Sequence, residues 1–335
     1  MRILYLFLLC LSTLFLACKK DKKEVDPVVV APERAYTDTS KIALSSNFES
    51  YLIKQKIDPV AVPDGFVLYR DIKEVDTLII SEPIGVSTSL KGIDGFTNLR
   101  YFSSKGLTVD TLDFSQNKKL QYFDYQPAAH CMFCTTLSVL NFGKVNSLRH
   151  LRLESSQVKS FNIGDLKLLN SLQLITNFGI RSLDVSGCKE LKMITTMGAL
   201  SNLTLGDHPK LEIMKCGKEL HGAKISKYPA LRILHVYCDG VVDLDFSKHT
   251  ELEEAHIIDP NKLSIDLTKA VKLKRVMVDG QTNWTQIAID LSQNKELKEC
   301  YLFATNIKTI CVSSMSMVST VDWKRDSTAE FKVCH

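Results

Sequence analysis

The sequence predicts a β-rich solenoid in which about eleven short repeats stack and line one face with a parallel sheet. Two observations support this prediction. One is a short alternating run that ends in a small residue, as in Ile289–Ser292. The other is an apolar L-x-x-L-x-L frame that begins five residues after that small residue, as in Leu297–Leu302. The pair returns roughly every 21 residues through most of the chain.

The small residue that closes the first run anchors each repeat. The anchors are Asp94, Ser115, Gly143, Gly164, Ser186, Gly206, Ser226, Ser247, Thr268, Ser292 and Ser313. Five residues further along, every repeat but the last has leucine: Leu99, Leu120, Leu148, Leu169, Leu191, Leu211, Leu231, Leu252, Leu273, Leu297 and Val318. A unit of this size cannot bury its own apolar face, so we expect the units to share one continuous core.

The position of a residue within the frame predicts which way its side chain points. We call the leucine position L. The L-x-L part has a period of two and therefore predicts a short parallel strand, with L, L+3 and L+5 turned inward and L+2, L+4 and L+6 turned outward. The L+3 residues are all apolar: Phe102, Phe123, Leu151, Leu172, Ile194, Met214, Leu234, Ala255, Val276, Cys300 and Val321. The small anchor suits a tight corner, where a hydroxyl can bond to nearby backbone.

The L-x-x-L-x-L frame resembles that of leucine-rich repeats. Four runs, LDFSQN (112–117), LDVSGC (183–188), LDFSKH (244–249) and IDLSQN (289–294), make the chain similar to the short-repeat leucine-rich lipoproteins of Gram-negative bacteria over about residues 41–321. The resemblance implies a right-handed superhelix or horseshoe of 20–24-residue repeats. The asparagine that this family carries after the strand is matched best by Asn177.

The N-terminal region predicts export and a lipid anchor. Residues 1–17 have an early Arg2 and an apolar run too short to span a bilayer, as in a signal peptide. Ala17-Cys18 resembles the bacterial lipobox, although Phe15 stands where leucine is usual, so Cys18 is the expected lipidation site. The alternative is an ordinary cleaved signal peptide with an incidental cysteine. Residues 18–40 are expected to form a flexible tether.

Two caps are expected at the ends of a solenoid spanning residues 91–323. Residues 41–90 do not carry the repeat and predict one short helix around Phe48 and Leu52, a turn at Asp64-Gly65, and a strand at 77–81. The segment from Asp64 to Asp71 has an echo of a calcium loop but too few oxygen ligands, which favours a plain turn. Residues 324–335 are expected to form the C-terminal cap.

The cysteines suggest disulfides rather than chemistry. An exported chain lies where disulfides persist. We expect Cys131 and Cys134 to form a local disulfide in an inserted loop, with free thiols, or metal or redox chemistry, as the alternatives. Cys311 and Cys334 could bridge the C-terminal cap. Cys216 and Cys300 fall on inward positions and are expected to act as small hydrophobes.

Charge and motifs argue against several function classes. The net charge of +4 comes from interspersed lysines and acids, which does not suggest nucleic acid. Acids in the LDxS runs are expected to accept backbone hydrogen bonds at the corners rather than to bind cations. The sequence has no G-x-S-x-G, P-loop, H-E-x-x-H or G-x-G-x-x-G, and the histidines look scattered. We therefore expect no enzyme, no cofactor and no metal site.

An outward apolar and aromatic stripe is the candidate binding face. Its residues, taken from L+2, L+4 and L+6, are Met193, Met197, Ile213, Ile233, His235, Tyr237, His256, Ile258, Met277, Tyr301 and Phe303. An apolar patch rimmed by polar groups often marks an interaction site. The sequence thus predicts an envelope lipoprotein of the outer membrane, on the cell surface or the periplasmic side, that binds a protein or a glycan. The alternative is a structural component of an envelope complex whose open face is merely packed.

Overall fold

The computed structural model describes residues 35–85, 88–127, 137–159, 166–177, 179–198, 200–218, 220, 222–238, 241, 243–259, 265–280, 286, 288–303, 306–325 and 329–334, which belong to one compact unit. The predicted signal peptide, Cys18 and the Cys131–Cys134 pair lie outside these residues. None of the helices within these ranges is long and apolar enough to cross a membrane.

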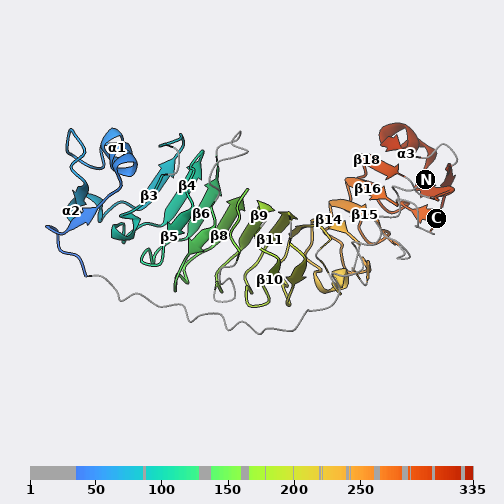
Figure 1. Ribbon diagram of the computed structural model, residues 1–335. Helices are drawn as coiled ribbons and strands as arrows, with labels where there is room; N and C mark the ends of the chain where they lie inside the picture. The colour runs from blue at the N-terminus through green and yellow to red at the C-terminus, as the bar shows by residue number, and fades with distance from the viewer. Residues whose placement is uncertain are drawn as a thin grey trace, which may run out of the picture. The chain divides into compact units, whose positions relative to one another are not determined.

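A parallel sheet of twelve described strands runs through the unit, as the sequence predicts. Its strands lie side by side in chain order (Figure 1). They are β3 (Thr77–Ile80), β4 (Tyr101–Lys105), β6 (Tyr122–Gln126), β8 (His150–Glu154), β9 (Ser171–Asn177), β11 (Met193–Gly198), β13 (Ile213–Cys216), β14 (Ile233–Tyr237), β15 (Glu254–Ile258), β16 (Arg275–Asp279), β18 (Glu299–Phe303) and β20 (Asp322–Lys324). The β-rich solenoid is thereby confirmed.

Shorter parallel ladders form a second side of the solenoid. β5 (Thr111–Asp113) pairs with β7 (Val139–Asn141), and β10 (Ser182–Asp184) pairs with β12 (Asn202–Thr204). β19 (Thr309–Val312) lies between β17 (Ala288–Asp290) and β21 (Glu330–Val333). These strands are the alternating runs that precede the anchors, so each turn of the chain contributes to the main sheet and, after a corner, to this second side.

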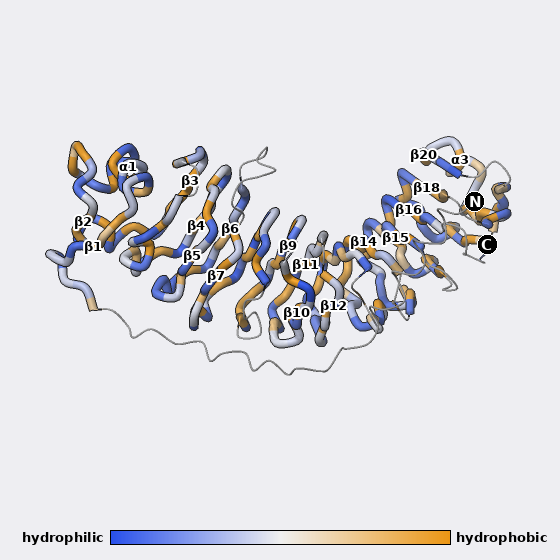
Figure 2. The backbone as a smooth tube through the Cα atoms, in the orientation of Figure 1, coloured by the Kyte–Doolittle hydropathy of each residue, from blue (hydrophilic) through white to orange (hydrophobic). Residues whose placement is uncertain are grey.

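The core follows the frame. Leu148, Leu151 and Leu153 occupy L, L+3 and L+5 of one repeat and are all fully buried. Figure 2 shows hydrophobic residues recurring along successive turns of the chain. Cys216 and Cys300 are buried, as their inward positions predict. Because each repeat buries its apolar side chains against the next, the core is one continuous column rather than a set of separate clusters.

Carboxylates brace the corners, as predicted. Asp113 Oδ1 accepts the Ser115 N–H at 2.8 Å. The same bond recurs from Ser186 to Asp184, from Ser247 to Asp245, from Thr268 to Asp266 and from Ser292 to Asp290. Hydrogen bonds from the serine hold the pKa of Asp184 and of Asp245 below the ordinary value. These carboxylates therefore serve as hydrogen-bond acceptors within the turn.

The anchors are small because neighbouring corners nearly touch. A Cβ on Gly206 would lie 2.8 Å from the Cα of Ser186, and one on Gly143 would lie 2.8 Å from the Cβ of Ser115. Contacts this short leave no room for a larger side chain. Close stacking of the corners thus explains glycine at 143 and 206.

A buried polar position two residues after the anchor was missed by the sequence analysis. Asn117 Nδ2 donates to the carbonyls of Ile93 and Phe96 in the preceding repeat, both at 2.9 Å. Asn294 Nδ2 does the same to Leu267 at 3.0 Å and Ala270 at 2.7 Å.

Two histidines occupy the same corner position. His208 and His249 are fully buried there, and burial lowers the pKa of both imidazoles. Asn177, the predicted family match, lies elsewhere in the repeat, where its Oδ1 accepts the N–H of Ile180 at 2.8 Å.

The N-terminal cap comprises β1 (Lys41–Ala43), α1 (Ser46–Lys54), β2 (Phe66–Leu68) and α2 (Tyr69–Ile72), with β1 and β2 antiparallel. The helix buries Phe48 and Leu52, and a 3₁₀ turn, η1 (Ile93–Gly95), follows at the first corner. Glu49 Oε1 accepts the N–H groups of Asp64 at 2.6 Å and Gly65 at 2.9 Å, which makes this segment the expected plain turn.

The statement that residues 41–90 lack the repeat is wrong at their end. Val75, Leu78 and Ile80 occupy L, L+3 and L+5, and β3 pairs in parallel with β4. This frame is hard to predict from the sequence because no corner with a small anchor residue precedes it. Helix α2 comes before it instead.

The last repeat differs from the predicted register by two residues. Trp323, not Val321, aligns with Cys300. Helix α3 (Met315–Thr320) replaces the extended corner here. A helix rises only about 1.5 Å per residue, so more residues are needed to reach the next strand. Cys311 and Cys334 form the disulfide that the sequence left possible, with Cα atoms 5.4 Å apart, and β20 and β21 reach into the range predicted as the C-terminal cap.

Candidate interaction surface

The outward side chains of the main sheet form the candidate surface. All eleven predicted residues lie on β11, β13, β14, β15, β16 or β18. Met197 and Phe303 are 52% and 42% exposed, and the other nine are half-buried. Half-burial is expected for this face, because strands about 4.8 Å apart bring equivalent side chains of neighbouring repeats into contact.

The register of the strands divides the predicted stripe into groups. Met193, Ile213 and Ile233 stand side by side at L+2 and form the first group. The second group lies nearer the C-terminus, at L+4 and L+6. It consists of Tyr237, Ile258, Met277, Tyr301 and Phe303. Met197 pairs with Ile175 at L+6, beside the first group.

The second group is larger than the first, but Asp279 stands between Ile258 and Phe303 in its L+6 row. Tyr237 aligns with Ile258, and Met277 aligns with Tyr301. The ring centroids of Tyr301 and Phe303 lie 6.1 Å apart. The Tyr301 hydroxyl donates to Asp322 at 2.9 Å, and this bond fixes the ring.

A charged network separates the two groups. His235 Nε2 donates to Glu254 at 2.5 Å, and Arg275 Nε donates to the same carboxylate at 3.0 Å. Burial opposes ionisation of Glu254, but the bonds from Arg275 and His235 hold its pKa below the ordinary value. The network sits where Glu254 aligns with Ile233, so the apolar L+2 row ends there.

The histidines of this face are paired by the repeat. His235 and His256 are aligned on neighbouring strands, and their ring centroids lie 5.4 Å apart. Burial lowers the pKa of His256, and the neighbouring His235 lowers it further. The histidines look scattered along the sequence. His235 and His256 are one repeat apart, however, and this separation places them side by side on neighbouring strands. Within the described residues no group of three or more His, Cys, Asp or Glu could hold a metal ion.

Charged residues at L+1 line one edge of the surface. Arg232 donates to Glu253 at 2.6 Å, and Lys274 donates to the same residue at 2.8 Å. Lys192 and Arg232 approach Glu212 at 3.8 and 3.9 Å. Because opposite charges alternate along the row, it forms a self-neutralised polar rim beside the first apolar group.

The N-terminal half of the face is aromatic and polar. Tyr101, Tyr122 and His150 stack face to face, with successive ring centroids 4.2 Å apart. Burial raises the pKa of Tyr122 to about 12, so its hydroxyl stays neutral. Beside this stack Arg152 donates to Glu154 at 2.6 Å and lies 3.7 Å from the buried Asp124. Tyr122 has both ring faces covered by its neighbours, and Tyr101 and His150 each have one face covered by Tyr122.

Comparison with known proteins supports the fold. No family model matches the chain, and no curated protein does either. Among solved structures, the functional domain of the internalin InlJ from Listeria monocytogenes is similar at 14% identity with a TM-score of 0.53, over 89% of this chain and 72% of that one. A leucine-rich-repeat protein of Leptospira interrogans matches at 15% identity and a TM-score of 0.43, over 78% of this chain and 91% of that one. Internalin InlF of Listeria monocytogenes matches at 13% identity and a TM-score of 0.45, over 85% of this chain and 92% of that one.

The chain therefore has a leucine-rich-repeat fold. The InlJ domain is described as including a cysteine ladder. The buried cysteines Cys188, Cys216, Cys238 and Cys300 fall at four different positions of the repeat and do not line up. The corner position two residues after the anchor holds asparagine or histidine in some repeats and apolar residues such as Val145 and Ala270 in others.

Proposed function

We propose that the chain is an exported, membrane-anchored lipoprotein that acts as a non-catalytic binding module for a protein partner through the strand face. The observation that supports this most is the second apolar group, Tyr237, Ile258, Met277, Tyr301 and Phe303, which lies on the outward side of four strands, with Asp279 between Ile258 and Phe303. Aromatic side chains and methionine are favoured at protein interfaces, and solenoids commonly bind through an extended face.

A protein partner fits this face better than a glycan. Sugars bind best to exposed flat ring faces, and in the flattest aromatic array, Tyr101–Tyr122–His150, internal stacking covers both faces of the central ring and one face of each outer ring. The second group mixes Met and Ile with aromatic rings, a composition that packs against apolar side chains. The structural alternative, in which the face only packs repeat on repeat, has the half-burial of nine of the eleven residues in its favour.

A triple substitution tests the binding face. Ile233, Tyr237 and Ile258 are replaced together with serine in the full chain, and proteins captured from the native envelope are identified by mass spectrometry. The matched control replaces Val139, Leu168 and Val271, which are 51%, 40% and 47% exposed and lie off the outward face of the main sheet. We expect the first variant to lose its partner and the control to keep it. Equal capture by both variants contradicts the proposal.

The lipid anchor is tested separately. Cys18→Ser should move the protein from the membrane fraction to the soluble fraction and abolish incorporation of labelled fatty acid. Cys10→Ser, within the predicted signal peptide, is the matched control and should change neither. Membrane retention of the Cys18 variant would rule out anchoring at this residue, while protease treatment of intact cells would separate the cell surface from the periplasmic side.

A further inference from the structure

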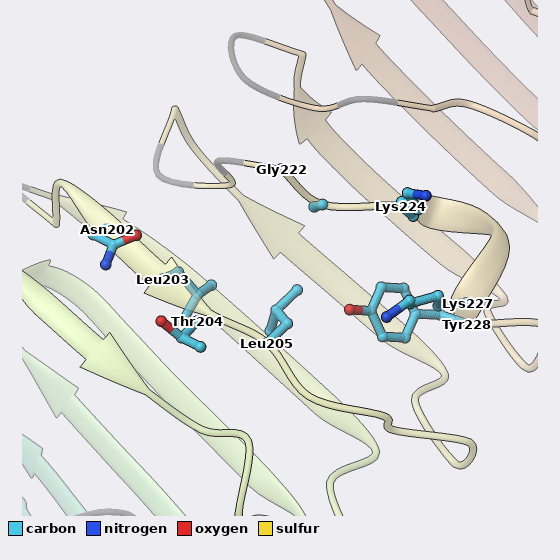
Figure 3. A pocket seen from close by; sticks show the side chains of 9 residues that line it. Asn202, Leu203, Thr204, Leu205, Gly222, Lys224, Lys227 and Tyr228 are labelled. Carbon is cyan, nitrogen blue, oxygen red and sulfur yellow. The ribbon is translucent and has the colours of Figure 1, made fainter.

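A pocket of about 260 Å³ lies on the second side of the solenoid, away from the proposed binding face. One wall is β12 and the residue after it, Asn202 to Leu205. The opposite wall is the extended segment 222–224 together with Lys227 and Tyr228 (Figure 3). Lys227 is the last residue of the short 3₁₀ turn η2 (Ile225–Lys227), and Tyr228 follows it. The pocket is thus a slot between two consecutive repeats.

The slot exists because residues 222–224 do not pair with β12. Counted from their anchors, residues 222–224 are the equivalents of β12, and they would be expected to pair with it as β12 pairs with β10. Lys224 instead bridges to Asp243 of the following repeat. Among the described strands, β12 therefore has a hydrogen-bonded neighbour on only one side.

The Ser226 corner takes its bracing acid from the following repeat. Five of the eleven corners have an aspartate two residues before the anchor, but before Ser226 that position is Lys224. Asp243 substitutes from the next repeat, where it accepts the Ser226 N–H at 3.1 Å and the Ser226 hydroxyl at 3.0 Å. This pair of bonds fastens the segment to the following repeat and leaves the slot open towards β12.

The free edge of β12 offers backbone hydrogen bonds. The Thr204 carbonyl accepts the Val185 N–H at 3.0 Å, so Thr204 faces β10. Alternate residues of a parallel strand turn their N–H and C=O to opposite neighbours, which directs those of Leu203 into the slot. An amide group placed in the slot can pair with them as a further strand would.

The charge and floor of the slot define the rest of the ligand. The rim carries two exposed lysines, Lys224 and Lys227, and none of the nine lining residues is acidic. Asp207 lies 3.8 Å from Lys227 but is 86% exposed, so this ion pair is weak and can be displaced. Buried Leu203, with partly buried Leu205 and Ala223, provides a small apolar floor.

We infer that this slot binds the carboxyl-terminal end of a peptide chain. The peptide amide pairs with the edge of β12, the terminal carboxylate lies between Lys224 and Lys227, and a small aliphatic side chain contacts Leu203 and Ala223. The volume is below the range of drug-sized pockets, roughly 300–1,000 Å³, and suits one or two residues. Because the lysines are exposed, the affinity is expected to be modest and to fall with added salt.

The test uses three probes on the purified full-length protein, measured by ligand-observed NMR titration. They are acetyl-Ala-Val with a free carboxylate, the same dipeptide as its carboxamide, and acetate. We expect the acid to bind, and the amide and acetate to bind at least about tenfold more weakly. Equal binding of acid and amide, equal binding of acetate, or no binding of the acid would each overturn the inference.

Variants locate the binding. The Lys224→Met/Lys227→Met protein should bind the dipeptide acid about tenfold more weakly, with an unchanged melting temperature. The matched control, Lys210→Met/Lys272→Met, removes exposed lysines that pair with Glu190 and Glu251 outside the slot. A control that loses as much affinity as the slot variant would mean that only overall charge matters. This inference does not depend on the function proposed for the strand face.

Discussion

At the scale of the residue, the corners decide what the repeat tolerates. The position two residues after the anchor is buried beside the carbonyls of the preceding repeat; it is apolar in several repeats, as at Val145, Leu166 and Ala270, and carries a hydrogen-bond donor in others. Asparagine fills it at 117 and 294, and histidine fills it at 208 and 249. Both residue types can donate a hydrogen bond, but only histidine titrates near neutral pH.

The His208 and His249 corners should make the fold sensitive to acid. Burial lowers the folded-state pKa of both imidazoles below the ordinary value of 6.5. The unfolded chain therefore binds protons that the folded chain refuses. Their stabilising contribution is complete above about pH 6.5 and is lost as the pH falls towards the folded-state values. Urea midpoints at pH 7.5 and pH 5.5 measure the loss.

His249→Asn should reduce that acid sensitivity. Asn117 and Asn294 show that asparagine fits this corner, so the cost at pH 7.5 should stay within about 1–2 kcal/mol. The decrease in the free energy of unfolding between the two pH values should be smaller than in the unaltered chain. A surface histidine change, His235→Asn, gives the comparison. An unchanged pH dependence in the His249 variant would show that this corner does not titrate on unfolding.

At the scale of the element, the two ends of the sheet depart from the repeat because helices intervene. Helix α2 precedes β3, and helix α3 precedes β20, where the register differs by two residues from the sequence prediction. At the C-terminus the disulfide between Cys311 and Cys334 holds β21 beside β19, and Trp323 packs against Phe331 with ring centroids 4.8 Å apart. The last turn therefore relies on a covalent link as well as on packing.

Cys311→Ser should loosen this last turn and little else. The two cysteines are 23 residues apart, and closing a loop of that size is worth about 3 kcal/mol in the chain-entropy treatment. Backbone amides of β21 should exchange faster with solvent, while those of β8 and β9 should keep their rates. Adding a reductant should reproduce the effect in the unaltered chain and have no further effect in the variant. Equal exchange of β21 in all samples would contradict a stabilising role.

At the scale of the whole molecule, the frame was predictable because its apolar residues recur at a nearly constant spacing along the sequence. Leu148, Leu231 and Leu297 were expected inside and are 0–5% exposed, and Ile233 and Tyr237 were expected outside and are half-buried on the outward face. One spacing rule fixes both rows, because alternate residues of a strand point to opposite sides. The fold and the direction of each candidate side chain therefore followed from the sequence.

The arrangement within the face did not follow in the same way. Glu254 interrupts the apolar L+2 row and pairs with His235 and Arg275, which lie on the neighbouring strands. Such contacts depend on how the side chains of three neighbouring repeats meet. The repeat pattern gives the direction of each side chain but not these contacts. The slot beside β12 was missed for a similar reason, since Lys224 bridges to Asp243 of the following repeat and not to β12.

The shared core predicts that damage in one repeat affects the whole unit. Leu231 is fully buried at the L position of a middle repeat. Leu231→Ala should lower the free energy of unfolding by about 2–5 kcal/mol, and Leu231→Asp should prevent folding because it buries an unpaired charge. Ile233→Ala, two residues away on the outward row, is the matched control and should cost less than Leu231→Ala. Equal costs at the two positions would contradict the inward and outward assignment.

Methionine oxidation tests the central claim, that one row of side chains is hidden and the alternate row is accessible. Met197 is 52% exposed on the outward face, whereas Met214, on the next strand of the main sheet, is fully buried. Brief peroxide treatment of the folded full-length protein, read by peptide mass spectrometry, should oxidise Met197 quickly and leave Met214 intact until the protein is unfolded. Rapid oxidation of Met214 in the folded protein, or protection of Met197 in the isolated chain, would contradict both the solenoid frame and the accessible face built on it.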